Sequence, residues 1–138
     1  MKYLKKWGAF AGLLVLLSLS ACKYEKPAPF RCGCPYPEVN KTVFMPASGD
    51  SVKVVFPEEG WWIWALEWKG EFKRVDNDTL RNHYRFDYRR DGFRLYRPNP
   101  RDLWIYMTKN TGNQSRRLGV YVENGNCHHL VTVIQQAP

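Results

Sequence analysis

The sequence predicts an all-β protein built as an antiparallel β-sandwich. From Val39 onward, apolar and polar residues alternate in short runs with a period of two, which is typical of strands that bury one face. Clusters of Pro, Gly, Asn, Asp and Ser separate these runs at regular spacing, as turns do. No window has a helical repeat strong enough to compete. Many short strands of this kind favour two packed antiparallel sheets.

Eight runs are predicted to be strands. They cover residues 42–45, 51–56, 61–68, 84–89, 93–96, 103–107, 117–123 and 129–135. Asp91-Gly92 predicts a two-residue hairpin turn, which would place Tyr88 opposite Leu95 on the apolar side of the hairpin. Asn124-Gly125 predicts a second hairpin near the C-terminus.

The run 61–68 is unusual because it contains four tryptophans. Regular alternation would place Trp62, Trp64, Leu66 and Trp68 on one face and Trp61, Ile63 and Ala65 on the other. Both faces cannot lie in the core of a two-layer sandwich, so some rings are expected to be exposed or covered only by the segment 70–102. In the alternative, the face with Ile63 fills the core and that segment buries the rest.

The N-terminus has the three parts of an export signal. Lysines at positions 2, 5 and 6 precede an apolar run from Trp7 to Leu19, and Ser20-Ala21-Cys22 closes it. Small residues followed by cysteine make this segment resemble a bacterial lipoprotein signal, which implies cleavage after residue 21 and lipidation of Cys22. The apolar run is too short to span a bilayer, which takes roughly 20 residues, so lipid is expected to supply the membrane anchor. No aspartate follows Cys22, so an outer-membrane location is expected, on either face.

Residues 22–38 are predicted to be an extended, proline-rich tether between the lipidated cysteine and a domain at 39–138. An exported protein can form disulfides. Cys32 and Cys34 are too close to pair with each other without strain, so either of them is expected to pair with Cys127. One thiol would then remain free.

The chain is basic, with a formal net charge of +8, and three of these charges belong to lysines of the signal. Its arginines are interspersed with acids and no nucleic-acid-binding motif is present, so a nucleic-acid partner is not expected. Acidic glycans or lipid headgroups would suit such a surface. A merely well-solvated surface would have the same composition.

A family resemblance covers residues 39–138. The segments that carry it are Phe44, Ala47-Ser48-Gly49, Val52-Lys53-Val54, Gly60-Trp61-Trp62, Asn110-Thr111-Gly112, Arg116-Arg117, Val120-Tyr121-Val122 and the run 131–135. In this order they resemble BACON domains of Bacteroidetes. The resemblance implies an immunoglobulin-like β-sandwich that binds carbohydrate or mucin. The segment 70–102 departs from the family pattern and is predicted to be an elaborated hairpin. Asp78-Thr79-Leu80 matches the O-glycosylation motif of this phylum, with Thr79 as the acceptor in a polar loop.

The candidate ligand-binding residues are aromatic and basic side chains. They are Trp61, Trp62, Trp64, Arg85, Arg89 and Arg94. Aromatic rings suit the flat C–H faces of sugars, and arginine can hold an acidic group with two hydrogen bonds. The alternatives are a packed tryptophan cluster and a solvated hairpin whose arginines form surface ion pairs.

No catalytic constellation stands out, so an enzyme is not expected, and no cofactor is indicated. Cys127-His128-His129 could suggest a metal site, but adjacent histidines on a strand point to opposite faces, and no metal is expected. Two functions remain. The first is a lipid-anchored envelope module that binds a glycan or mucin-type ligand. The second is an accessory outer-membrane lipoprotein that contacts another protein.

Overall fold

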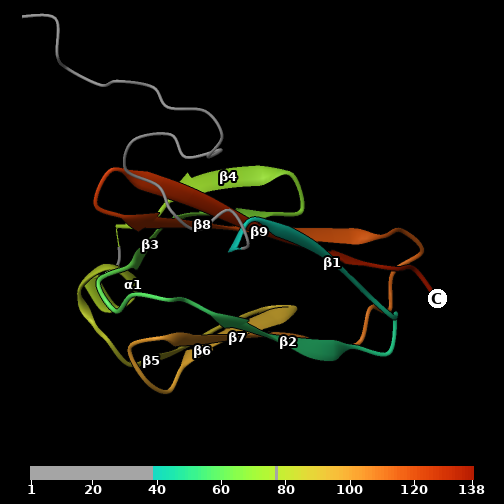
Figure 1. The fold of residues 1–138 in the computed structure, drawn as a ribbon. Helices are drawn as coiled ribbons and strands as arrows, with labels where there is room; N and C mark the ends of the chain where they lie inside the picture. Colours follow the sequence, from blue (N-terminus) through green and yellow to red (C-terminus); the bar gives the residue numbers. More distant parts are fainter. Residues whose placement is uncertain (1–38, 77) are drawn as a thin grey trace, which may run out of the picture.

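The computed structural model describes residues 39–76 and 78–138, which form two β-sheets packed face to face (Figure 1). The five-stranded sheet has the order β1 (Lys41–Met45), β9 (Cys127–Gln135), β8 (Arg116–Asn124), β3 (Trp62–Trp68) and β4 (Glu71–Arg74). The four-stranded sheet has the order β2 (Asp50–Val55), β7 (Asp102–Met107), β6 (Phe93–Arg97) and β5 (Phe86–Arg90). The predicted signal, the lipidation of Cys22 and the tether lie outside the described residues.

The arrangement confirms the predicted immunoglobulin-like sandwich. In such folds strands C, F and G form one sheet and strands B, E and D belong to the other. Here β3, β8 and β9 correspond to strands C, F and G, and β2, β7 and β6 correspond to strands B, E and D. Strand β1 pairs in parallel with β9, whereas every other ladder is antiparallel.

The core lies between the two sheets and is built from the predicted alternating positions. On β8, Leu118, Val120 and Val122 are fully buried, and on β9, Val131 and Val133 face the same way. Leu95, Leu103 and Ile105 meet them from the four-stranded sheet and are equally buried. Burial of these branched side chains is the main stabilising contribution to the fold.

The two hairpin predictions have different outcomes. Tyr88 pairs with Leu95 and Arg90 pairs with Phe93, so the two-residue turn at Asp91-Gly92 is confirmed. Gly92 has a φ of 95°, a conformation that favours glycine. The second hairpin turns one residue later than predicted, because Asn124 still pairs with Cys127 and the turn is Gly125-Asn126.

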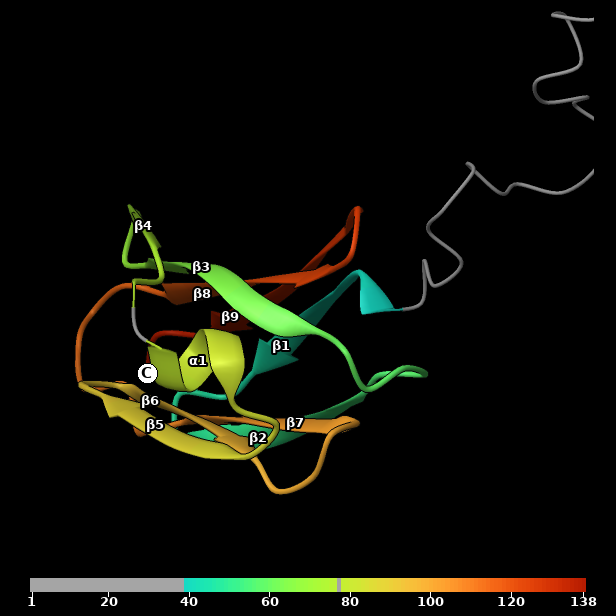
Figure 2. The ribbon, with the colours of Figure 1, turned by 90° about the vertical axis from the view of Figure 1, so that its left-hand side faces the viewer.

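The segment 70–102 contains two elements that alternation did not predict. Strand β4 has all four residues exposed, so it lacks the alternating burial that marks a strand in a sequence. Helix α1 (Asp78–Asn82) has only five residues, and its Leu80 is 1% exposed. Figure 2 shows α1 between the two sheets at one end of the sandwich, where Leu80 closes the core. No helix among the described residues is long and apolar enough to cross a membrane.

A β-bulge in β3 makes the predicted split of the tryptophans wrong. Ile63 pairs with Val122 and Ala65 pairs with Tyr121, so Trp64 is an extra residue in the ladder. The bulge reverses the alternation, because an extra residue shifts every later side chain to the other face. Leu66 and Trp68 therefore pack with Ile63 against the core. Trp64 is left on the outer face of the five-stranded sheet, where it contacts Tyr121.

Candidate functional site

Trp64 is the centre of an aromatic cluster on the outer face of the five-stranded sheet. Its ring meets Phe72 of β4, Tyr121 of β8 and His128 of β9 edge-on, with centroids 5.8, 5.7 and 5.9 Å apart. The guanidinium of Arg74 lies 5.9 Å from the Trp64 ring centroid. Four strands thus fix the indole in one orientation, which lowers the entropy that binding must remove.

A hollow of about 330 Å³ opens beside this ring, and we call it the Trp64 hollow. It is lined by Trp64, Arg74, Val75, Asp76, Arg81, Glu123 and His128. Two guanidinium groups and two carboxylates therefore border it, so it offers both donors and acceptors. The indole N–H of Trp64 is buried and has no hydrogen-bond partner among the described residues, so the polar groups of the hollow are those of its charged residues. An aromatic wall with such polar groups matches the needs of a sugar-binding site.

A second hollow, of about 290 Å³, is also bordered by Arg81, and we call it the Arg97 hollow. It is lined by Gly60, Trp61, Trp62, Arg81, Asn82, His83, Tyr84 and Arg97. Trp62 is half-buried and Tyr84 is exposed, so both can present ring surface to solvent. Arg81 borders both hollows, which makes them neighbours along α1.

Arg97 is a buried cation that joins three loops. Its guanidinium lies 3.6 Å from the Trp61 ring centroid, and the residue as a whole is 2% exposed. It donates hydrogen bonds to the backbone oxygens of Glu59, Trp61, His83 and Pro100, at 2.8, 2.9, 3.4 and 2.6 Å. Burial lowers the pKa of Arg97 to about 10, so the group stays charged at neutral pH.

The structure separates the six candidate ligand-binding residues. Trp61 is 2% exposed and stacks on Phe56 with centroids 4.1 Å apart, so its ring belongs to the core. Trp62 and Trp64 border the two hollows, and Arg85 is exposed but lines neither. Arg89 and Arg94 lie on the other sheet, where both bind Asp87.

The outer face of that sheet carries a cation–aromatic surface whose rings are not among the residues predicted from the sequence. Trp104 and Tyr106 stack with centroids 6.1 Å apart, and Arg94 lies 5.2 Å from the Tyr106 ring. Hydrogen bonds from Arg94 and then Arg89 lower the pKa of Asp87 to about 2. The two arginines of this surface are thus already paired with Asp87. The sequence contained a signal for this surface, because Trp104 and Tyr106 alternate with core residues in the predicted strand 103–107 and must therefore face outward.

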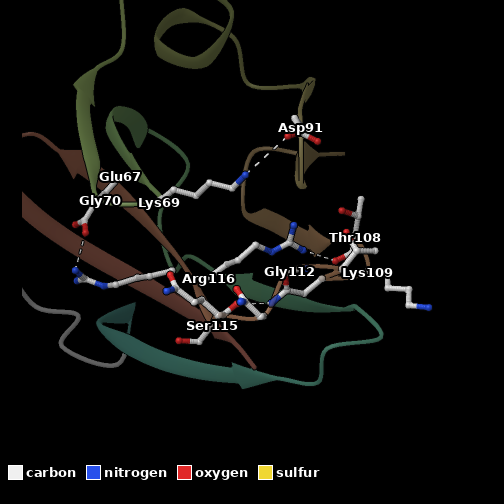
Figure 3. A pocket seen from close by; sticks show the side chains of 14 residues that line it. Glu67, Lys69, Gly70, Asp91, Thr108, Lys109, Gly112, Ser115 and Arg116 are labelled. Carbon is white, nitrogen blue, oxygen red and sulfur yellow. Dashed lines mark hydrogen bonds and ion pairs between the residues drawn. The ribbon is translucent and has the colours of Figure 1, made fainter. Parts of the chain in front are cut away.

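Figure 3 shows a larger hollow, of about 710 Å³, among the loops at the opposite end of the sandwich from α1. Two of its cations have carboxylate partners, because Arg117 contacts Glu67 at 2.7 Å and Lys69 contacts Asp91 at 3.9 Å. Arg116 donates to the Thr108 oxygen at 2.7 Å. The walls contain no aromatic ring. We therefore assign this region a structural role in holding the loops together.

Asn110 shapes the loop that borders this end. It is 2% exposed, and its Nδ2 donates to the backbone oxygens of Gln114 and Gln136 at 2.8 and 3.0 Å. Its Oδ1 accepts from the Gly112 N–H at 3.1 Å. One amide thus satisfies three backbone groups, which accounts for the Asn110-Thr111-Gly112 motif in structural terms.

The remaining sequence-predicted positions have these places. Cys127 is buried and disulfide-bonded, and its partner lies outside the described residues, so the pairing with Cys32 or Cys34 stays a prediction. Thr79 is exposed, but it lies on α1 and not in a polar loop as expected. His128 is exposed and His129 is 5% exposed. Among residues 39–76 and 78–138, no three His, Cys, Asp or Glu side chains are placed to hold a metal.

Comparison with known proteins supports the fold. No protein-family model matches the chain, and no curated protein sequence matches it. A protein from Bacteroides thetaiotaomicron, whose structure was determined by NMR, is similar with a TM-score of 0.59 and 21% identity over 72% of this chain and 78% of that chain. This chain therefore resembles a β-rich domain of a Bacteroides protein.

A second solved structure is more distant. It is a Bacteroides ovatus GH5 xyloglucanase in complex with a XXXG heptasaccharide, with a TM-score of 0.44 and 10% identity. The similarity covers 74% of this chain but only 18% of that enzyme. At this level the likeness does not bear on function.

Proposed function

We propose that this protein is a non-catalytic carbohydrate-binding module held at the bacterial outer membrane by a lipidated Cys22. The observation that carries the binding role is the placement of Trp64. The β-bulge turns this ring out of the core, and its aromatic neighbours hold it at the wall of a polar hollow. A cluster of rings on an outer sheet face is a common mark of a binding site, and Trp64 forms such a cluster with Phe72 and Tyr121.

The chemistry of the Trp64 hollow supports a sugar as the ligand. The faces of a sugar ring carry C–H groups that pack on an indole, and its hydroxyls both donate and accept hydrogen bonds. The hollow provides the matching pair of groups, because Arg74 and Arg81 donate while Asp76 and Glu123 accept. The resemblance to BACON domains points to the same class of ligand.

The binding role is tested by replacing Trp64 with alanine. We expect the W64A protein to bind its best glycan at least about tenfold more weakly, which corresponds to about 1.4 kcal/mol. An array of glycans identifies the ligand of the unmodified protein, and titration calorimetry then compares affinities.

W104A is the matched control, because Trp104 is also a half-buried ring on an outer sheet face but lies on the other sheet. We expect this variant to retain the affinity of the unmodified protein. The proposal would be contradicted if the unmodified protein bound no glycan on the array. It would also be contradicted if W64A and W104A lost affinity to the same extent.

One observation favours the second function, an accessory lipoprotein that contacts a partner protein. The five-stranded sheet ends in β1 and β4, and these edge strands carry the exposed rings of Phe44 and Phe72, which are 68% and 50% exposed. An edge strand with an exposed aromatic can accept a strand of another chain. Pull-down with the lipidated protein and an F44A variant tests this contact.

A further inference from the structure

We propose that the Arg97 hollow is a subsite for an anionic group, so that the carbohydrate bound beside Trp64 is an acidic saccharide. This inference rests on the proposed function and adds the class of ligand. The group would be a carboxylate, which is planar, or a sulfate ester, which is tetrahedral. Both carry negatively charged acceptor oxygens that a guanidinium can bind.

The two neighbouring hollows differ in charge. In the Trp64 hollow, Asp76 and Glu123 offset the charges of Arg74 and Arg81. The residues lining the Arg97 hollow include Arg81 and Arg97 but no aspartate or glutamate side chain. A neutral sugar suits the first hollow, whereas the second attracts an anion.

The charge of Arg97 strengthens this asymmetry because no described carboxylate pairs with it. All its hydrogen bonds among the described residues go from the two terminal nitrogens to backbone oxygens, which leaves Nε without a partner there and the net charge in place. Glu59 offers Arg97 only its backbone oxygen, since its carboxylate lies 3.7 Å from Arg101. A buried charge without a counterion projects its field into the adjoining hollow more strongly than an exposed one would.

Arg97 itself is too enclosed to touch a ligand, so direct contact falls to Arg81. Arg81 is exposed on α1 and borders both hollows, and its side chain has no ion pair or hydrogen bond among the described residues. Its guanidinium can therefore bind an anionic group with two hydrogen bonds. The rings of Trp62 and Tyr84 flank the same space and supply the surface for the sugar that carries the group.

The basic hollow in Figure 3 is a poorer candidate for this ligand. Arg117 and Lys69 there already have carboxylate partners, Glu67 and Asp91, as its ion pairs show. A ligand that bound Arg117 or Lys69 would have to displace these internal contacts, and no aromatic ring lines that hollow to hold a sugar, whereas the Arg97 hollow has both an Arg81 side chain that no described residue pairs and ring surface.

The test compares matched glycans that differ only in the anionic group. The full chain, purified in detergent, is applied to uronic-acid oligosaccharides and their methyl esters, and to sulfated oligosaccharides and their desulfated forms. We expect at least about tenfold tighter binding of the charged member of one pair, and a preference that falls as salt is added. The carboxylate and sulfate arms identify which group is bound.

Two variants locate the preference. R81Q is expected to remove most of the difference between charged and neutral members, and R85Q, an exposed arginine outside both hollows, is expected to leave it unchanged. Equal binding of charged and neutral members, with W64A still weakening both, would overturn this inference and leave the proposed function standing. If the unmodified protein bound no glycan at all, both this inference and the proposed function would be overturned.

Discussion

Replacing Arg97 with methionine is expected to lower the free energy of unfolding by about 4 kcal/mol. Methionine fills a similar volume but donates no hydrogen bond. Four backbone oxygens from three loops would lose their hydrogen-bond donor. The oxygen of Trp61 is the most enclosed of the four, because both this hydrogen bond and the Trp61 side chain are buried. An unsatisfied buried polar group costs about 1–3 kcal/mol, and water can replace only part of what the guanidinium supplies.

Thermal unfolding measures this effect, with a melting temperature expected to fall by roughly 20 °C in R97M. R97K should give an intermediate fall, because an ammonium keeps the charge but lacks the planar fork that reaches all four oxygens. R90M is the matched control on the adjacent strand β5, since Arg90 is exposed, and it should change the melting temperature little. A melting temperature for R97M equal to that of R90M would contradict the role given to Arg97.

The second large effect concerns Cys22, whose replacement by serine is expected to move essentially all of the protein out of the membrane fraction or leave it unprocessed. The apolar run before Cys22 is shorter than the roughly 20 residues that a membrane span requires. Lipid on one cysteine would therefore be the anchor. Fractionation of cells and labelling with radioactive palmitate measure the two consequences.

C34S is the control for this experiment, because it removes another cysteine of the N-terminal segment but leaves the signal intact. We expect C34S to remain in the membrane fraction and to keep its label. If C22S stayed membrane-bound and labelled, Cys22 would not be the lipidated residue and the envelope location proposed for the protein would lose its support.

The alternation of apolar and polar side chains predicts most of this fold, because the most buried strands of the two sheets alternate without interruption. Strands β8 and β9 place Leu118, Val120, Val131 and Val133 on one face without interruption, so a period of two is visible in the sequence. The tight turn at Asp91-Gly92 likewise depends only on local backbone preferences. Such features need no knowledge of distant residues.

The parts that the sequence did not predict depend on contacts between distant residues or on local irregularity. The bulge at Trp64 leaves no mark in a run of four tryptophans, yet it decides which rings face solvent. Helix α1 is too short for periodicity to be detected, and it is held by the burial of Leu80. Arg97 looks like the other arginines of its segment until its loops are brought together.

The candidate site shows the same limit. The sequence identified Trp62 and Trp64 as candidate contacts, because a crowded aromatic strand cannot bury both faces. It grouped them with Arg89 and Arg94, which the fold places on the opposite sheet beside Asp87. Arg81, which borders both hollows, could be recognised only once α1 had been placed against β3.

The most direct test of the central claim, that Trp64 marks the carbohydrate site, is the response of the tryptophan indole N–H signals in an NMR titration. The signals are assigned with single Trp→Phe variants, and the glycan selected on the array is then added. We predict that the Trp64 signal shifts most and the Trp62 signal shifts with it, while those of Trp68 and Trp104 stay in place. A shift confined to Trp104 would contradict the account, because it would place the ligand on the opposite sheet.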